Sequence, residues 1–566
     1  MLSLPIDLAL YYTPVENARN CKINVRTFSN VISSHRFITQ INLRCRLGSA
    51  QMYKLWSVKH MISRVYSTTC YGVTACLIEV EVDISPGLPQ TTIVGLPDQA
   101  IKESKERVKS AIKNSGFPFS PKKLTINLAP ADLKKEGPSF DLAIAIGILA
   151  STGHVNPNAL NQFLFLGELA LDGSLRKVRG ALPAATLAKE INRPLIVPFE
   201  NTDEVSLEKE AHVLCANHLT EVIRFLNGEL DLSKAKSRGI KPISTNTVLD
   251  FSEVKGQWHA KRAIEIACSG GHNLLFVGPP GAGKTMLASR ISTILPPLED
   301  SEAIEISKIY SVAGLFSGGA LHHARPFRSP HHTISQIGLV GGGSYPRPGE
   351  ISLAHGGVLF LDEFPEFHRD VIEALRGPLE EGVILISRAK QNLVFPARFL
   401  LVCAMNPCPC GHLTNRKQVC RCSLGQIQRY LNKISGPILD RIDLHVELPT
   451  VEYKDLADTT PSESSADIKK RVLRARAVQA KRFQGIKIAT NAQMNPREIK
   501  KFCGLDSDSK QLLERAMKEL SFSARGYFKM IKIARTISDL ADSETIESVH
   551  IAEALQYRSL DRNYFG

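Results

Sequence analysis

The pattern of apolar and polar residues changes several times along the chain, and each change marks a predicted element. Strand-like alternation runs through VYSTTCYGVTACLIEVEVDI, and a basic helix is predicted over Lys102–Asn114. A strand in KLTINLAP, an apolar helix over Asp141–Ala150, a hairpin in FLFLGELALDG, a helix over Gly180–Glu190 and a strand in RPLIVPF follow. Mixed strands and helices of this kind predict an α+β domain over residues 61–229.

A second patterned region begins after a polar, basic stretch, residues 230–248, which is typical of a linker. The segment VKGQWHAKRAIEIACSGGHN predicts a helix that ends at a glycine, and the apolar runs LLFV, VLFL and FLLVCAM predict short buried strands. Continuous apolar runs are typical of strands covered on both faces, as in a parallel sheet. We therefore expect an α/β domain over residues 249–450 and an α/β multidomain protein overall.

The remainder, residues 451–566, is helical by its period. A strongly basic helix is predicted over Ala466–Phe483. Four further helical pieces are predicted over Glu498–Phe502, Ser507–Leu520, Gly526–Ala541 and Ser548–Tyr557. No apolar run reaches the roughly 18 residues that a membrane helix needs, so we expect no membrane partner.

Residues 1–60 follow no such pattern. This segment is rich in arginine and lysine and contains only two acidic residues, Asp7 and Glu16. This composition fits an organelle transit peptide, or a poorly ordered N-terminal extension. We favour the extension, because clear patterning starts at Met61.

The charge of the chain favours polyanionic partners. Lysine and arginine number 70 against 56 acidic residues, which leaves a formal net charge of +14. Nucleic acid is the first candidate and an acidic membrane the second. The excess is spread along the chain, so charge alone is weak evidence.

A phosphate-binding motif stands at LLFVGPPGAGKT, Leu274–Thr285. The glycines let backbone N–H groups close around a phosphate at the start of a helix, whose positive dipole end favours that charge. Lys284 can reach the β- and γ-phosphates of ATP, and the Thr285 hydroxyl can bind Mg²⁺. The predicted ATP-binding residues are Gly278, Pro279, Pro280, Gly281, Ala282, Gly283, Lys284 and Thr285.

Polar residues follow two other predicted strands of this domain. Asp362 and Glu363 end VLFLDE, and Asn406 ends FLLVCAMN. Asp362 can hold Mg²⁺ through water, Glu363 can polarise the attacking water, and Asn406 can contact the γ-phosphate.

Two insertions in this domain are candidates for contacting the substrate. The first is rich in glycine, arginine and paired histidines, among them His331 and His332, and we expect a mobile basic loop there rather than a metal site. The second, GVILISRAKQNLVFPARFLL, predicts a hairpin with Arg388 and Lys390 near its tip. Such a tip is commonly solvated, but inside the pore of a ring it would grip a phosphate backbone.

Four cysteines crowd into a short segment directly after Asn406. Cys408 and Cys410 form one C-x-C pair, and Cys420 and Cys422 form another. Four thiolates on two short turns suit a structural Zn²⁺ site, with an iron–sulfur cluster or unliganded structural cysteines as alternatives. Metal-binding thiolates indicate a reducing compartment, so we expect a cytoplasmic protein.

Two arginines have open roles. Arg441, between Asp440 and Asp443 in SGPILDRIDLHVEL, makes either an internal salt bridge or an arginine finger directed at a neighbouring subunit. Arg525, in the turn FSARGY, can reach a γ-phosphate from a lid, with Arg535 as the rival.

From residue 61 onward the chain resembles the ComM/YifB-like family of magnesium-chelatase-type AAA+ ATPases. The resemblance rests on VEVDISPGLP, IVGLPD, NLAPADLKKEGPSFDL, GPPGAGKT, FLDEFPEF, NPCPCG and SGPILDRIDLHVEL. It implies a homo-hexameric, ATP-driven motor on single-stranded or branched DNA, linked to branch migration in natural transformation. It also implies Arg441 as a finger acting in trans, Arg525 as a lid sensor, and a helical lid over residues 451–566.

The first domain resembles the Lon-protease fold, so proteolysis must be weighed. Ser139 falls where those proteases carry their nucleophile, but Leu182 occupies the position of the dyad lysine and Lys177 lies off that register. We therefore interpret Ser139 as a relic, in a domain that serves as a ring collar or a DNA-binding face. The rivals to a DNA motor are a chelatase-like motor subunit and an ATP-dependent protease or unfoldase.

Overall fold

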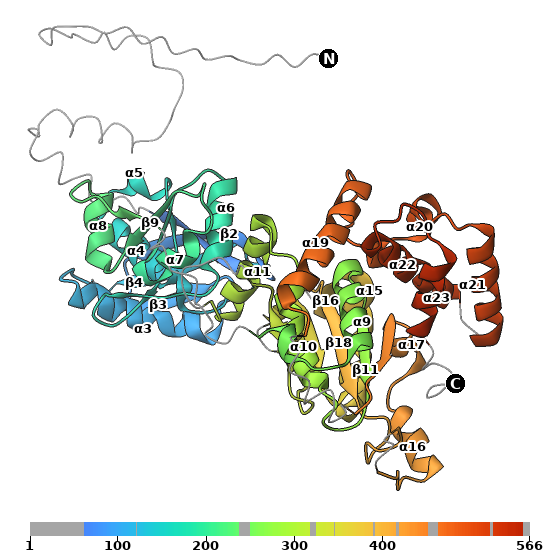
Figure 1. Ribbon diagram of the computed structural model, residues 1–566. Coiled ribbons are helices and arrows are strands. Elements are labelled where there is room, and N and C mark those ends of the chain that lie inside the picture. The colour runs from blue at the N-terminus through green and yellow to red at the C-terminus, as the bar shows by residue number, and fades with distance from the viewer. Residues whose placement is uncertain are drawn as a thin grey trace, which may run out of the picture. The chain divides into compact units, whose positions relative to one another are not determined.

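A mixed α/β architecture with a parallel sheet is confirmed by the computed structural model (Figure 1). The structure describes residues 62–119, 122–236, 249–316, 324–343, 346–388, 391–414, 418–450, 462–520 and 524–558. The predicted N-terminal extension and Lys390 lie outside the described residues. In the part of the chain that is described, no helix combines the length and the apolar character needed to cross a membrane.

The first domain is built on an eight-stranded mixed sheet with the order β10-β9-β8-β5-β1-β2-β4-β3. Its strands are β1 (Ser63–Tyr71), β2 (Thr74–Ser85), β3 (Gln90–Val94), β4 (Lys123–Ala129), β5 (Leu164–Phe165), β8 (Leu195–Pro198), β9 (Val213–Ala216) and β10 (Ser233–Lys234). The predicted alternation becomes the long β1–β2 hairpin, which turns at Gly72 with a φ of 63°. Inward-facing residues such as Val65, Val80 and Val82 are fully buried.

Helices cover this sheet, and three of them lie where the sequence predicts them: α3 (Gln99–Asn114), α4 (Asp141–Ser151) and α6 (Ala181–Glu190). The sequence did not predict the shorter helices α5 (Pro157–Leu160), α7 (Thr202–Val205) and α8 (Leu219–Leu226). Residues 141–150 of α4 are all buried, because α4 packs on β1 and β2 and also against α3. A helix without a polar face is expected in such a position.

One predicted element of this domain is wrong. The segment FLFLGELALDG was expected to form a hairpin, but its first part is β5, which pairs in parallel with β1 and β8. The hairpin instead joins β6 (Glu168–Leu169) to β7 (Leu175–Arg176). Both residues of β5 are fully buried, so parallel pairing inside the large sheet replaces the local pairing.

The second sheet is five-stranded and parallel, with the order β12-β15-β18-β11-β19. Its strands are β11 (Leu274–Val277), β12 (Phe327–Arg328), β15 (Val358–Leu361), β18 (Leu400–Met405) and β19 (Leu444–Glu447). In Figure 1, helices α9 (Trp258–Gly270) and α10 (Lys284–Ile294) lie beside β11 and β18. Because the strands are parallel, β11, β18 and β15 end at one edge of the sheet, and that edge carries the site described below.

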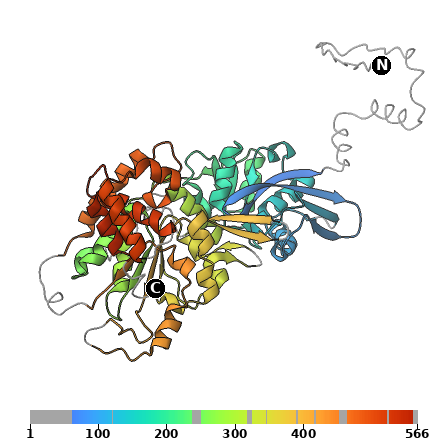
Figure 2. The same ribbon diagram turned by 90° about the vertical axis from the view of Figure 1, so that its right-hand side faces the viewer.

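The same domain contains shorter strands and helices outside this sheet. The predicted hairpin is confirmed: β16 (Val383–Arg388) pairs antiparallel with β17 (Gln391–Pro396), and Figure 2 shows it as a ribbon apart from the five-stranded sheet. The other strands and helices are α11 (Asp300–Ala313), α12 (Gln336–Val340), β13 (Gly341–Gly342), β14 (Arg347–Pro348), α13 (Glu350–Leu353), α14 (Arg369–Glu373), α15 (Arg376–Glu381), α16 (Leu424–Leu431) and α17 (Gly436–Leu439).

The C-terminal region is helical, as its period predicts. Its helices are α19 (Ser465–Arg482), α20 (Pro496–Phe502), α21 (Ser507–Leu520), α22 (Ala524–Leu540) and α23 (Ser548–Gln556). Val472 of α19 and Met530 of α22 belong to the same buried cluster as Ile264 of α9 and Phe276 of β11. The helices therefore share a hydrophobic core with one face of the five-stranded sheet.

Candidate nucleotide site and cysteine cluster

The phosphate-binding loop has the backbone that its glycines predict. The turn leaves β11 at Val277, and α10 begins at Lys284 directly after Gly283, whose φ of 85° is left-handed and suits glycine. At the start of the turn, a Cβ on Gly278 would lie 2.6 Å from the carbonyl oxygen of Leu448. The loop thus presents the free N–H groups of the first turn of α10, an arrangement that binds anionic phosphate.

Lys284 and Asn406 meet, as the order of strand ends predicts. The Lys284 ammonium donates hydrogen bonds to the carbonyl oxygens of Gly278 at 2.7 Å and Pro279 at 3.0 Å, and to Oδ1 of Asn406 at 3.0 Å. Burial lowers the pKa of Lys284, and the nearby carboxylates of Asp362 and Glu363 oppose that shift. The lysine therefore has its head group inside the loop, beside the end of β18.

Thr285 and Asp362 also come together. The Thr285 hydroxyl donates to Oδ2 of Asp362 at 2.6 Å, and the backbone N–H of Glu363 donates to Oδ1 of Asp362 at 2.9 Å. A hydroxyl and a carboxylate oxygen are hard ligands of the kind Mg²⁺ prefers, beside waters and phosphate oxygens. These two residues fit the predicted magnesium site.

Glu363 has a partner that the sequence did not reveal. Its backbone is left-handed, with a φ of 52°, and its Oε2 lies 3.1 Å from Nδ1 of His332. The His332 ring packs against His331, with 4.1 Å between ring centroids. The loop that carries both histidines starts at Arg328, which forms an ion pair with Glu350 at 2.6 Å. The sequence predicted a mobile basic loop for the paired histidines. The one feature of the sequence that could have pointed to a contact with Glu363 is that they lie in an insertion of an ATPase-like domain.

The two candidate arginines share one carboxylate. Arg441 donates to Glu380 and, at 2.5 Å, to the carbonyl oxygen of Pro437, and Arg525 lies 3.9 Å from the same Glu380 oxygen. Arg441 therefore has an internal ion pair, but with Glu380 on α15 rather than with an adjacent aspartate. Asp443 is engaged elsewhere, because its Oδ1 accepts from Lys529 at 2.8 Å.

The rival arginine, Arg535, is held inside the C-terminal helices. Only 3% of its side chain is exposed, and it contacts Asp539 at 2.9 Å. Its Nη1 and Nη2 also donate to the carbonyl oxygens of Glu544 and Ser543, both at 2.7 Å. All these contacts are structural, which leaves Arg525, whose side chain is 66% exposed, as the better placed of the two.

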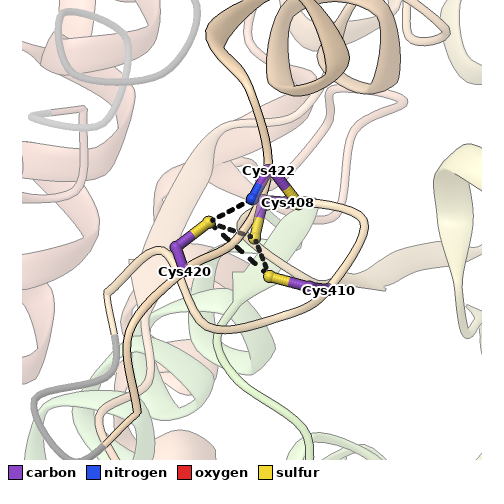
Figure 3. Close-up of side chains that lie close together, drawn as sticks. All are labelled: Cys408, Cys410, Cys420 and Cys422. Carbon is purple, nitrogen blue, oxygen red and sulfur yellow. Dashed lines mark hydrogen bonds between the residues drawn. The ribbon is translucent and has the colours of Figure 1, made fainter.

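The four cysteines converge (Figure 3). The sulfur of Cys408 lies 3.4 Å from that of Cys410 and 3.6 Å from that of Cys420. All four sulfurs, including that of Cys422, lie within 4.8 Å of one another. A tetrahedron of thiolates around one ion, with metal–sulfur bonds of about 2.3 Å, has edges of about 3.8 Å. The spacing therefore fits a single tetrahedral ion, and the four cysteines are free of disulfides.

The residues weighed for proteolysis have other partners. The backbone carbonyl of Ser139 accepts from the N–H of Gly167 at 2.9 Å. Leu182 is fully buried, and the Lys177 ammonium donates to the carbonyl oxygen of Phe316 at 3.0 Å. The lysine position of a Ser–Lys dyad is thus filled by a core leucine.

A glycine-rich loop joins β11 to a helix, an acidic pair follows β15, and an asparagine follows β18, which lies between those two strands. These features define a P-loop nucleotide-binding protein of the AAA+ class. The family models agree with this class. Residues 250–456 match the magnesium chelatase ChlI subunit, residues 80–201 match the ChlI subunit of Mg-chelatase, and residues 462–558 match the ChlI C-terminal region. The chain belongs to the ComM/YifB-like family of magnesium-chelatase-type AAA+ proteins.

Individual relatives support the family assignment. The chain is 47% identical to the competence protein ComM of Haemophilus influenzae over 503 residues, which cover 88% of this chain and 97% of the relative. It is also 47% identical to YifB of Escherichia coli over 502 residues, which cover 88% of this chain and 98% of the relative. Lon protease 2 of Bacillus subtilis is 27% identical over 203 residues, 34% of each chain, which supports the Lon-like resemblance.

Proposed function

We propose that this chain is an ATP-driven motor that works on DNA as a ring of six subunits and promotes branch migration. The observation that carries the proposal is the convergence of Lys284, Thr285, Asp362, Glu363 and Asn406 at one edge of the parallel sheet. These groups can bind ATP with Mg²⁺ and hydrolyse it, so the nucleotide is an energy source rather than a static ligand.

Each residue has a distinct role in the proposed hydrolysis. The loop N–H groups and Lys284 bind the phosphates, while Thr285 and Asp362 hold Mg²⁺, which neutralises charge that develops on the phosphate oxygens. Glu363 accepts a proton from the attacking water, and Asn406 orients that water or the γ-phosphate. His332 occupies one Glu363 oxygen and so limits turnover.

Arg441 completes a neighbouring subunit's site in this proposal, and Arg525 senses the γ-phosphate from the lid. Both lie at Glu380, and the Arg441 guanidinium can leave that carboxylate for a γ-phosphate across a subunit boundary. A finger that acts in trans requires an oligomer, and closed rings are the form in which such head-to-tail contacts are satisfied. The C-terminal helices would then serve as the lid that carries Arg525.

DNA is the proposed substrate because three features point the same way. The net charge is +14, the sequence of the β16–β17 hairpin includes the basic residues Arg388 and Lys390, and a relative with 47% identity is named for competence. The basic tip suits a phosphate backbone inside a ring, where it would contact single-stranded or branched DNA without reading its sequence. The same relative supports a role in recombination during natural transformation.

We also propose that the four cysteines hold structural Zn²⁺. The mutual spacing of the sulfurs suits one tetrahedral ion, whereas a cluster distributes its cysteines over several irons. Because such a site requires reduced thiolates, we place the protein in the cytoplasm.

The rival functions have less support. A chelatase motor subunit is favoured by the family models, but the cysteine cluster has no evident role in metal insertion into a porphyrin. A protease is disfavoured by Leu182, which cannot share a proton with Ser139.

The ATPase rate of the purified chain tests the proposal. We expect branched DNA to raise the rate several-fold, and Glu363→Gln to abolish turnover while leaving ATP bound. Indifference to every form of DNA, together with stimulation by a porphyrin, would favour the chelatase-like rival. Peptide hydrolysis that Ser139→Ala abolishes would favour the protease.

A further inference from the structure

We propose that metal bound by Cys408, Cys410, Cys420 and Cys422 controls ATP affinity, because the segment it holds supports the P-loop. For brevity we call residues 408–422 the knuckle. The inference rests on the proposed metal site and nucleotide site, and it assigns the metal a regulatory role as well as a structural one.

The first half of the knuckle touches the P-loop directly. The chain turns after Cys408, where the N–H of Gly411 donates to the carbonyl oxygen of Cys408 at 2.9 Å. A Cβ placed on Gly411 would lie 2.5 Å from Cδ and 2.9 Å from Cγ of Pro280. The same position lies 3.8 Å from Cγ of Asn406. The knuckle backbone therefore lies against the loop that would bind the phosphates.

The second half reaches the same place through helix α16. This helix begins directly after Cys422, where Ser423 and Gln426 form a capping box. Near its end, the largely buried Tyr430 belongs to the same hydrophobic cluster as Cys408 and Met405, and Met405 directly precedes Asn406. Asn406 accepts a hydrogen bond from Lys284. The second cysteine pair is thus connected, through α16, to the strand end that carries Asn406.

A metal ion is what joins these two halves. Nine residues separate Cys410 from Cys420, so the two C-x-C pairs come from separate turns of the chain. Without an ion, the two pairs are in contact through weak sulfur–sulfur hydrogen bonds, from Cys420 to Cys408 at 3.6 Å and to Cys410 at 3.5 Å. One ion coordinated by all four thiolates holds the pairs together far more strongly. Loss of the ion would free Gly411 and α16 to move, and Pro280, Asn406 and Lys284 would lose a common support.

Removal and return of metal is the direct test. The full-length protein is titrated with an organomercurial, the released metal is measured with a colorimetric chelator, and the thiols are then freed with dithiothreitol. Affinity for a fluorescent ATP analogue is measured without DNA. We expect the metal-free protein to bind at least tenfold more weakly, and Zn²⁺ alone to restore the affinity. Purified protein without metal, or equal affinity in both states, would overturn the proposal.

A variant that keeps all four cysteines distinguishes loss of the contact with the P-loop from unfolding caused by metal removal. Gly411→Ala places a methyl group against Pro280, while Gly485→Ala imposes the same left-handed strain, with a φ of 80° against 79°, where no atom lies within 4 Å. We expect Gly411→Ala to retain metal but weaken ATP binding at least fivefold relative to Gly485→Ala. Equal affinities would show that the contact between Gly411 and Pro280 does not connect the metal site to ATP binding. Since DNA is absent from both tests, a negative result here would not contradict the proposed motor function on DNA.

Discussion

Lys284→Met is the substitution whose effect on ATP binding follows most directly from the structure. Methionine keeps the length and apolar stem of lysine but removes the ammonium. That ammonium has three neutral acceptors in the site: two loop carbonyls and the Asn406 amide oxygen. When ATP binds, phosphate oxygens replace some of these acceptors. The binding free energy that Lys284→Met loses is therefore the difference between the hydrogen bonds to phosphate and those to the protein acceptors.

The size of the loss can be worked out from those bonds. Two contacts between an ammonium and phosphate contribute about 1.5–3 kcal/mol each to binding. The hydrogen bonds to protein acceptors that Lys284 gives up when ATP binds reduce this contribution by about 1–2 kcal/mol. The net loss of about 2–4 kcal/mol corresponds to a roughly 30- to 1000-fold weaker ATP affinity. Because burial already lowers the pKa of Lys284, its replacement by an apolar residue should not lower the melting temperature.

Calorimetric titration with a non-hydrolysable ATP analogue and Mg²⁺ measures this effect. The control is Lys518→Met, which removes an exposed lysine paired with Glu514 on α21. We expect the control to bind as the unaltered protein does. An affinity of Lys284→Met within threefold of the control would refute the assignment of this lysine to the phosphates.

Three further outcomes are expected. Rings that mix Arg441→Ala subunits with Lys284→Met subunits should recover part of the ATPase rate that each variant alone lacks, because some sites then join an intact Lys284 to an intact Arg441 of the next subunit; no recovery would contradict action in trans. His332→Ala should raise the DNA-independent rate severalfold, because it frees an oxygen of Glu363; an unchanged or lower rate would show that the histidine does not restrain the carboxylate. Burial raises the pKa of Asp141 to about 6, despite the opposing ion pair with Arg107, from a usual value of 3.8. The folded protein therefore binds that proton more tightly, and urea unfolding should show stability rising as pH falls from about 7 to 5 relative to Asp141→Asn; parallel profiles would contradict this.

The sequence predicted the nucleotide site well because local rules determine it. Buried parallel strands require continuous apolar residues, so VLFL and FLLVCAM identified strands whose ends must share an edge. The glycines of the P-loop are required by its backbone, as the left-handed Gly283 shows. These constraints were enough to place Lys284, Thr285, Asp362 and Asn406 together.

Contacts between distant loops could not be predicted in the same way. His332 meets Glu363 because an insertion follows a particular path, and no local pattern encodes that path. The sequence left Arg441 as either an internal salt bridge or an arginine finger, and it could not reveal that α15 brings Glu380 to this arginine across 61 residues of sequence. The two-residue β5 was misassigned because so short an apolar run fits a local hairpin as well as a parallel strand.

Migration of a synthetic DNA junction is the measurement that tests the central claim most directly. Purified protein is mixed with a labelled three-way or four-way junction, ATP and Mg²⁺, and the separated products are followed in time beside Glu363→Gln. We predict that the unaltered chain converts the junction only when ATP is hydrolysed, and that Glu363→Gln binds ATP without converting it. Vigorous ATP hydrolysis with no movement of any junction would contradict a motor that acts on DNA.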